Sequence, residues 1–135
     1  MTDVLSVAPQ ISADDVAAAA KLGVKVLINN RPDGEEPGQP TGAEIKAAAE
    51  AAGLAYVEIP VDRSGLSPDH LDAWDAAGEA PALAYCRSGT RSITLWAHAA
   101  ARRGMDIDEI ISLASNAGYD LRGHRATFEM LAKAR

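Results

Sequence analysis

The sequence predicts an α/β domain in which a mostly parallel central sheet is flanked by helices. Short apolar segments rich in β-branched residues alternate with segments that begin at helix-capping residues, and glycine or proline separates them. With 47% hydrophobic residues among 135, the chain has enough apolar side chains for one continuous core. We therefore expect a single domain over residues 1–135.

Four segments are expected to form the strands of this sheet. Each is mainly apolar and is bounded by turn residues, and the fourth follows a proline and is typical of a buried central strand. Because a helical segment separates each strand from the next, the connections are crossovers and the strands run parallel. The expected strands are residues 5–7, 24–29, 54–61 and 82–85.

Capping residues mark where the helices begin. Ser12 precedes two aspartates, Thr41 and Glu44 have the spacing of a capping box, and Ser67 comes before a proline at the first helical position. A glycine ends each of these three helices. The expected helices are residues 12–22, 41–53, 67–78, 92–103, 106–117 and 121–134, and residues 30–40 form a loop rich in proline and glycine.

Charge and composition exclude several kinds of partner. The net charge of −6 and the pI near 4.9 argue against nucleic acid and against an anionic membrane surface, because both attract basic proteins. The chain has no leader-like start and no apolar run long enough to span a bilayer, so we expect a cytoplasmic protein. The three histidines fall on different expected helices without ligand spacing, so we expect no metal and no cofactor.

The one cysteine lies in a turn between the last strand and a helix, in the segment Cys86-Arg87-Ser88-Gly89-Thr90-Arg91. Backbone N–H groups at such a junction bind an anion, and with the helix dipole and Arg91 they stabilise a thiolate. Arg91 offers a planar fork that matches oxyanion oxygens, and Gly89 permits the turn. We therefore expect Cys86 to be a nucleophile and not a buried structural cysteine. The other residues expected at the anion are Arg87, Ser88, Gly89, Thr90 and Ser92.

Residues that follow the other strands are candidates for the same site, because the carboxyl ends of parallel strands meet at one edge of a sheet. Asp62 is either a general acid or an aspartate that holds a turn, and Asp33 is a weaker second candidate for the acid. Arg31 and Arg63 are expected either to add positive charge at the site or to pair with neighbouring acidic residues.

The cysteine loop resembles those of two groups of enzymes. Dual-specificity phosphatases have five residues between Cys and Arg, whereas this chain has four, with Tyr85 where those enzymes usually have His. The shorter loop is similar to that of single-domain rhodaneses, which carry a sulfane sulfur on the cysteine.

Over nearly its whole length the chain resembles the phosphatase-like domain family of β-lactamase hydrolase-like proteins. The resemblance rests on the segments VAPQI at residues 7–11, NNRPDGEEPGQP at 29–40 and AYCRSGTRS at 84–92. It implies the fold of the dual-specificity cysteine phosphatases, and members of the family have been described both as phosphatases and as sulfurtransferases.

The loop supports three functions, of which the first is our leading hypothesis. The short loop favours a sulfurtransferase in which Cys86 takes sulfane sulfur from a small anionic donor and passes it to a thiol acceptor. The alternative is a phosphatase in which Cys86 forms a phosphocysteine from a phosphoester, Arg91 binds the oxygens and Asp62 is acid and then base. The third is a non-catalytic anion-binding module, which the presence of both Cys86 and Arg91 disfavours.

Overall fold

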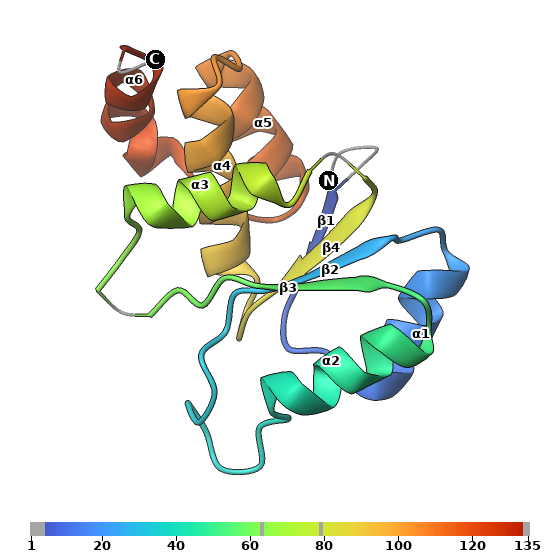
Figure 1. Cartoon of the computed structure of the whole chain (residues 1–135). Coiled ribbons are helices and arrows are strands. Elements are labelled where there is room, and N and C mark those ends of the chain that lie inside the picture. The colour runs from blue at the N-terminus through green and yellow to red at the C-terminus, as the bar shows by residue number, and fades with distance from the viewer. Residues whose placement is uncertain (1–4, 63, 79, 134–135) are drawn as a thin grey trace.

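The computed structural model describes residues 5–62, 64–78 and 80–133 and has an α/β architecture (Figure 1). Its sheet has the strand order β1-β4-β2-β3, and every recorded pairing is parallel. The expected fold class is confirmed, and the fourth strand is central as expected. The strands are β1 (Leu5–Ala8), β2 (Val26–Asn29), β3 (Ala55–Glu58) and β4 (Ala82–Tyr85).

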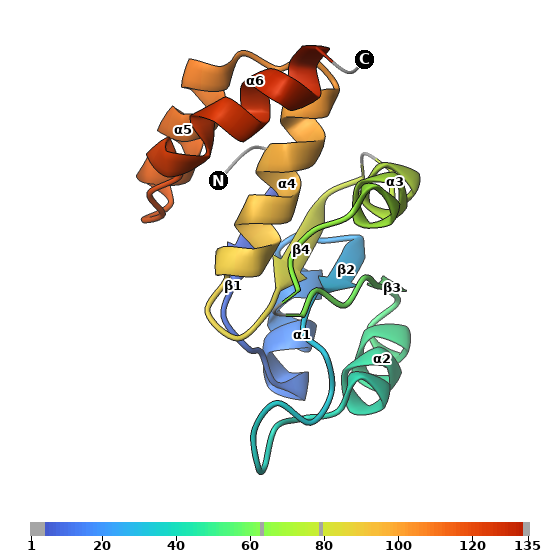
Figure 2. The same ribbon diagram turned by 90° about the vertical axis from the view of Figure 1, so that its left-hand side faces the viewer.

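Helices cover both faces of the sheet (Figures 1 and 2). Two helices, α1 (Ala13–Lys21) and α2 (Gly42–Ala51), pack side by side on one face. The other face carries α3 (Pro68–Ala76), α4 (Thr90–Arg102), α5 (Ile107–Asn116) and α6 (Arg125–Lys133), with a 3₁₀ turn η1 (Arg122–His124) before α6. Within the described part of the chain, no helix combines the length and apolar character needed to cross a bilayer.

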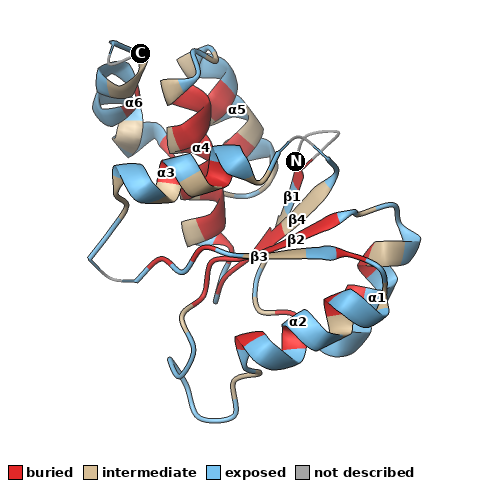
Figure 3. Ribbon diagram, in the orientation of Figure 1, coloured by how far each residue is buried: buried red, intermediate tan, exposed pale blue. Residues whose placement is uncertain are grey.

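Each face of the sheet has its own apolar core, because successive side chains of a strand point to opposite sides. Leu27 and Tyr85 pack with the helices α1 and α2, whereas Ile28 and Ala84 belong to the larger core beneath α3 to α6. Figure 3 shows that β2 and the inward sides of the helices are buried, while the outward sides of the helices are exposed. The edge strand β3 has no buried residue. The central strands β2 and β4 are thus held between two packed layers.

The capping residues lie where the sequence places them. Ser12 and Asp15 form a reciprocal capping box at the start of α1. At the start of α3, the Ser67 N–H donates to His70 Nδ1 at 2.9 Å. Of the capping box expected at α2, the structure has the bond from the Glu44 N–H to Thr41 Oγ1, at 3.1 Å. These local bonds satisfy N–H groups that have no partner inside their helices.

Two boundaries differ from expectation close to the cysteine loop. Strand β3 ends at Glu58 and not at residue 61, because Pro60 has no N–H to donate to a neighbouring strand. The chain still follows β2, since Ile59 N donates to Asn29 O and Val61 N donates to Asn30 O. Helix α4 begins at Thr90, two residues earlier than expected, so the cysteine loop runs directly into the helix.

The remaining differences lie at chain turns. Strand β2 begins at Val26 and not at residue 24, because Val24 N donates to Ala19 O and closes the end of α1. The expected last helix divides into η1 and α6, and its final expected residue, Ala134, lies outside the described residues. None of these shifts alters the order of the elements.

Candidate active site

Three loops meet at the carboxyl-terminal edge of the sheet, as the parallel topology requires. They follow β2, β3 and β4, and they enclose an open cavity of about 530 Å³. The described residues that line it are all charged: Glu35, Asp62, Arg87 and Arg91. The expected meeting of these loops is therefore present, and the site suits a small ionic ligand.

Cys86 lies at the base of the turn that joins β4 to α4. It is fully buried, and its N–H donates to Ala8 O at 3.3 Å, which holds it against the end of β1. The Gly89 N–H donates to Cys86 Sγ at 3.0 Å. Gly89 has φ = 90°, a left-handed conformation that favours glycine, and it immediately precedes α4. The sulfur therefore lies next to the amino-terminal end of a helix, where backbone donors stabilise negative charge.

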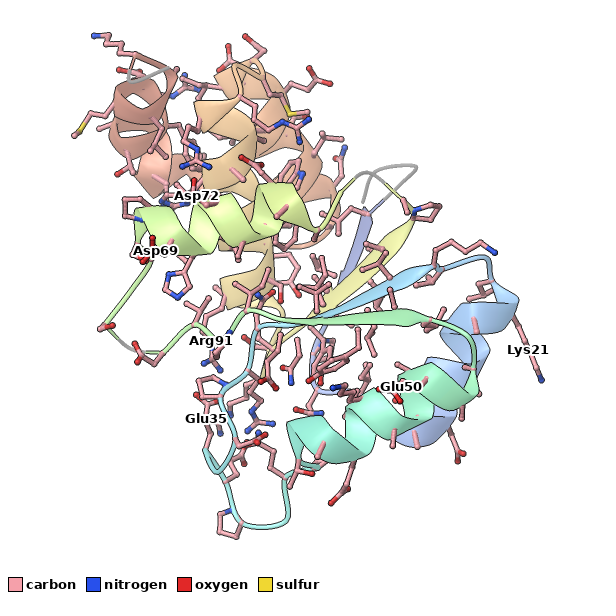
Figure 4. All side chains as sticks on the ribbon, viewed as in Figure 1. Lys21, Glu35, Glu50, Asp69, Asp72 and Arg91 are labelled. Atoms are coloured by element: carbon pink, nitrogen blue, oxygen red, sulfur yellow. The ribbon has the colours of Figure 1, made fainter. Side chains whose placement is uncertain are left out.

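Arg91 is held by the loops that follow β2 and β3. Its Nη1 donates to Glu35 Oε2 at 2.8 Å and to Val61 O at 2.7 Å, and its Nη2 donates to Glu35 Oε1 at 2.8 Å. Figure 4 shows the Glu35 and Arg91 side chains close together. The hydrogen bond to Glu35 raises the pKa of Arg91, and the nearby Cys86 sulfur adds to that effect.

A guanidinium group has five N–H donors, and these contacts use three of Arg91's. The other two, on Nε and on Nη2, lie along one edge of the group and have no hydrogen-bond acceptor among the described residues. Such an edge can donate two parallel hydrogen bonds to two oxygens of one oxyanion.

Arg31 is a buried partner of acidic residues. Its side chain is 3% exposed, and its three nitrogens donate to Glu35 Oε1, Gln10 Oε1 and Glu36 Oε1 at 2.8, 3.0 and 2.6 Å. Of the two roles expected for Arg31, the structure therefore has the ion-paired one. Its contacts place Glu35 against Arg91, and both arginines lower the pKa of Glu35 to about 2, the hydrogen bond from Arg91 having the largest effect.

Arg87 remains the accessible arginine of the cysteine loop. Its side chain is 62% exposed, and its Nε lies 3.1 Å from Glu36 Oε1. The Gln10 N–H donates to Arg87 O at 3.3 Å, so the turn after β1 also supports this loop. Arg63, which is expected either to add positive charge here or to pair with a neighbouring acidic residue, lies outside the described residues.

Asp62 both lines the cavity and holds a turn. Its Oδ1 accepts hydrogen bonds from Ser64 Oγ at 2.5 Å and from Ser64 N at 2.8 Å. These bonds, that from the hydroxyl first, lower the pKa of Asp62. Asp33, the second candidate for the acid, accepts from Gly42 N at 2.7 Å and supports the start of α2. Asp62 is therefore the better placed of the two for chemistry in the cavity.

The hydroxyl groups expected at the anion occupy different environments. Ser88 Oγ donates to Thr90 Oγ1 at 3.0 Å at the exposed side of the loop. Ser92 lies inside the first turn of α4, fully buried, and its Oγ has no hydrogen-bond partner among the described residues. A buried hydroxyl without a partner can donate a hydrogen bond to a group on the cysteine loop.

Two contacts of the site have no signal in the sequence. Glu35 pairs with Arg91 across 56 positions, and the Tyr119 hydroxyl donates to Ser88 O at 2.9 Å across 31. Tyr119 follows α5, in a segment that the sequence marks only as a turn after Gly118. Spacing rules reach residues within one helix or hairpin, so neither contact can be derived from them. Among the residues that the structure describes, no group of three or more acidic, His or Cys side chains is arranged to hold a metal.

Comparisons with known proteins agree with this geometry. The family model for the phosphatase-like domain of beta-lactamase hydrolase-like proteins matches residues 1–103. Beta-lactamase hydrolase-like proteins of Agrobacterium fabrum and Xylella fastidiosa are each 37% identical to the chain over 121 residues. That match covers 87% of this chain and 28% of each relative, so the chain spans less than a third of their length.

Solved structures that resemble this chain include phosphatases. A crystal structure of a candidate phosphatase from Neisseria meningitidis has a TM-score of 0.81 and 38% identity, covering 99% of this chain and 95% of that one. The core catalytic domain of a PP-IP phosphatase from S. cerevisiae, in complex with citrate, has a TM-score of 0.68 at 15% identity, covering 96% and 83%. This second likeness concerns the fold alone. Together the comparisons favour the phosphatase alternative over sulfur transfer, our leading hypothesis from the sequence.

The ion pairs of Glu35 predict how the free energy of unfolding depends on pH. Folding lowers the pKa of Glu35 from 4.5 to about 2, so its contribution to stability is complete above about pH 5 and is lost as the pH falls toward 2. Allowing for solvent screening, we expect Glu35→Gln to lower the free energy of unfolding by roughly 1–2 kcal/mol at pH 6 and by less than half of that at pH 3. Urea unfolding at the two pH values measures both differences. Glu50→Gln, on the exposed side of α2, is the control, and an equal deficit for Glu35→Gln at both pH values would contradict the role of these pairs.

Proposed function

Because this chain belongs to the phosphatase-like domain family of beta-lactamase hydrolase-like proteins, we propose that it hydrolyses phosphomonoesters through a phosphocysteine on Cys86. One observation carries the proposal. Cys86 Sγ lies at the amino-terminal end of α4, with the Gly89 N–H at 3.0 Å, and Arg91 lies in the first turn of the same helix. A nucleophile and two kinds of anion ligand thus share one small site.

Binding of the phosphoryl group uses the donors that the protein leaves available. The edge of Arg91 formed by Nε and Nη2 binds two oxygens. The third is bound by the dipole of α4 and by loop N–H groups other than those of Cys86, Gly89 and Thr90, which already have acceptors. Arg87 adds positive charge at the cavity mouth. Arg91 and the loop N–H groups are held in place before the substrate arrives, so they stabilise charge in the transition state without reorganising.

The reaction has two steps. In the first, the Cys86 thiolate attacks phosphorus, the bond from phosphorus to the ester oxygen breaks, and protonated Asp62 gives its proton to the leaving oxygen. Because the bonds from Ser64 lower the pKa of Asp62, this step is favoured at acidic pH. In the second, ionised Asp62 takes a proton from water, the water oxygen attacks the phosphocysteine, and the sulfur–phosphorus bond breaks to release phosphate and the thiolate. The buried Ser92 hydroxyl donates a hydrogen bond to the sulfur as it leaves.

Substitution of Asp62 separates phosphoester hydrolysis from sulfur transfer. Expelling an alkoxide needs a proton, so Asp62→Asn should lower kcat/KM for an alkyl phosphate by about 10²-fold or more, with a smaller loss for an aryl phosphate that has a good leaving group. Passing sulfur from a persulfide expels only the stabilised thiolate and needs no such acid. Steady-state rates with both phosphates, and with thiosulfate plus a thiol, measure the difference.

Cys86→Ser is the matched control for that experiment and should abolish hydrolysis of both phosphates. Ready sulfur transfer by the unmodified protein, unaffected by Asp62→Asn and without phosphatase turnover, would overturn the proposed function and restore the sulfurtransferase hypothesis.

Arg91 provides a second test, because charge alone does not supply two parallel hydrogen bonds. Arg91→Lys should fold but should lose roughly 10²-fold or more in kcat/KM for an aryl phosphate, since an ammonium group cannot form both the Glu35 contacts and the anion contacts. Arg125→Lys, on exposed α6, is the control and should retain full activity. Near-normal turnover by Arg91→Lys would show that another group binds the phosphoryl oxygens.

A further inference from the structure

The peptide unit between Ser88 and Gly89 is held at both of its polar ends. Its N–H, which belongs to Gly89, donates to Cys86 Sγ at 3.0 Å. Its carbonyl, which belongs to Ser88, accepts from the Tyr119 hydroxyl at 2.9 Å. In a planar trans peptide the N–H and the C=O point in opposite directions, so the group that fixes one of them also fixes the other.

The Ser88–Gly89 peptide needs a hydrogen bond from another segment to fix its orientation, because glycine leaves it free to rotate. Gly89 has φ = 90°, and glycine populates positive and negative φ with similar ease. A rotation of the Ser88–Gly89 peptide would turn the N–H away from the sulfur and bring the negative end of the carbonyl dipole toward it. The thiolate and a bound oxyanion would both lose a donor and gain a repulsive neighbour.

We propose that Tyr119 is a positioning residue that locks this peptide with its N–H toward Cys86. Tyr119 acts through Ser88 O and not through the substrate. It comes from the segment after α5, beyond residues 1–103 that the family model matches. This role rests on the proposed phosphatase site. Its test measures the reactivity of the Cys86 thiol, however, and therefore does not depend on phosphoester hydrolysis.

Close packing around the hydroxyl supports this role. A Cβ placed on Gly89 would lie 2.1 Å from Tyr119 Oη, so the phenol occupies the space that any side chain at position 89 would need. Burial, and secondarily the negative charge of Cys86, raises the pKa of Tyr119, which keeps the phenol a neutral donor. Among the described residues, the titratable groups that interact with Cys86 are Arg91, near the start of α4, and Tyr119 itself, after α5.

The test is the pH dependence of Cys86 alkylation in Tyr119→Phe, which keeps the ring and removes the hydroxyl. Loss of one oriented hydrogen bond should lower the alkylation rate at pH 6.5, relative to its alkaline plateau, by about fivefold. Tyr56→Phe is the matched control: it removes a tyrosine hydroxyl on β3 that bonds to Asn29 and Glu58, and its profile should coincide with that of the unmodified protein. Because alkylation needs no substrate, absent phosphatase turnover would count against the proposed function and leave this result intact.

Two results would overturn the assignment. One is an alkylation profile of Tyr119→Phe that superimposes on that of the unmodified protein, and the other is an equal change in Tyr56→Phe. Hydrogen exchange of the unmodified protein adds a test that needs no variant: the Gly89 amide should be protected, and exchange at the rate of an exposed glycine would contradict a locked peptide.

Discussion

The two-point ion pair between Arg91 and Glu35 ties together the three loops of the candidate site. Glu35 lies on the loop after β2, Arg91 opens α4, and Val61 O, beyond β3, accepts a third hydrogen bond from the same guanidinium. Arg31 is buried, so its charge must be paired, and it forms ion pairs with Glu35 and Glu36. The fixed orientation of Arg91, and the choice of which of its donors remain for a ligand, both follow from this pair.

The pair also explains how an acidic protein can hold an anion. With a net charge of −6, the whole molecule does not attract anions over a distance. Capture must rely on short-range donors: the loop N–H groups, the end of α4, and arginines whose charge Glu35 and Glu36 offset only in part. Such a site favours a small ligand whose charge is concentrated on one group, because a larger anionic surface would meet the surrounding carboxylates.

Much of the fold could be predicted from the sequence because its signals are local. Caps such as Ser12 and Ser67, and the turn that contains Cys86, depend on residues a few positions apart. The pairing of Arg31 with Glu35 and Glu36 is also local and was one of its two expected roles. The contact of Arg31 with Gln10, the pairing of Arg91 with Glu35 and the contact from Tyr119 depend on which loops the sheet brings together, and no local pattern encodes them. The chemistry was harder to predict for a related reason: the four-residue spacing from Cys86 to Arg91 favoured sulfur transfer, whereas the whole chain, its family and its solved relatives favour a phosphatase.

The most direct measurement of the central claim is the chemical identity of the group that Cys86 carries during turnover. A phosphoester labelled in its phosphoryl group would be mixed with the protein, quenched within milliseconds and digested, and the peptide that contains Cys86 would be examined. The account predicts a labelled phosphocysteine on that peptide, formed before product and consumed as phosphate appears. Phosphate release without any label on Cys86, or a sulfur atom as the only adduct that the protein forms from any donor, would contradict it.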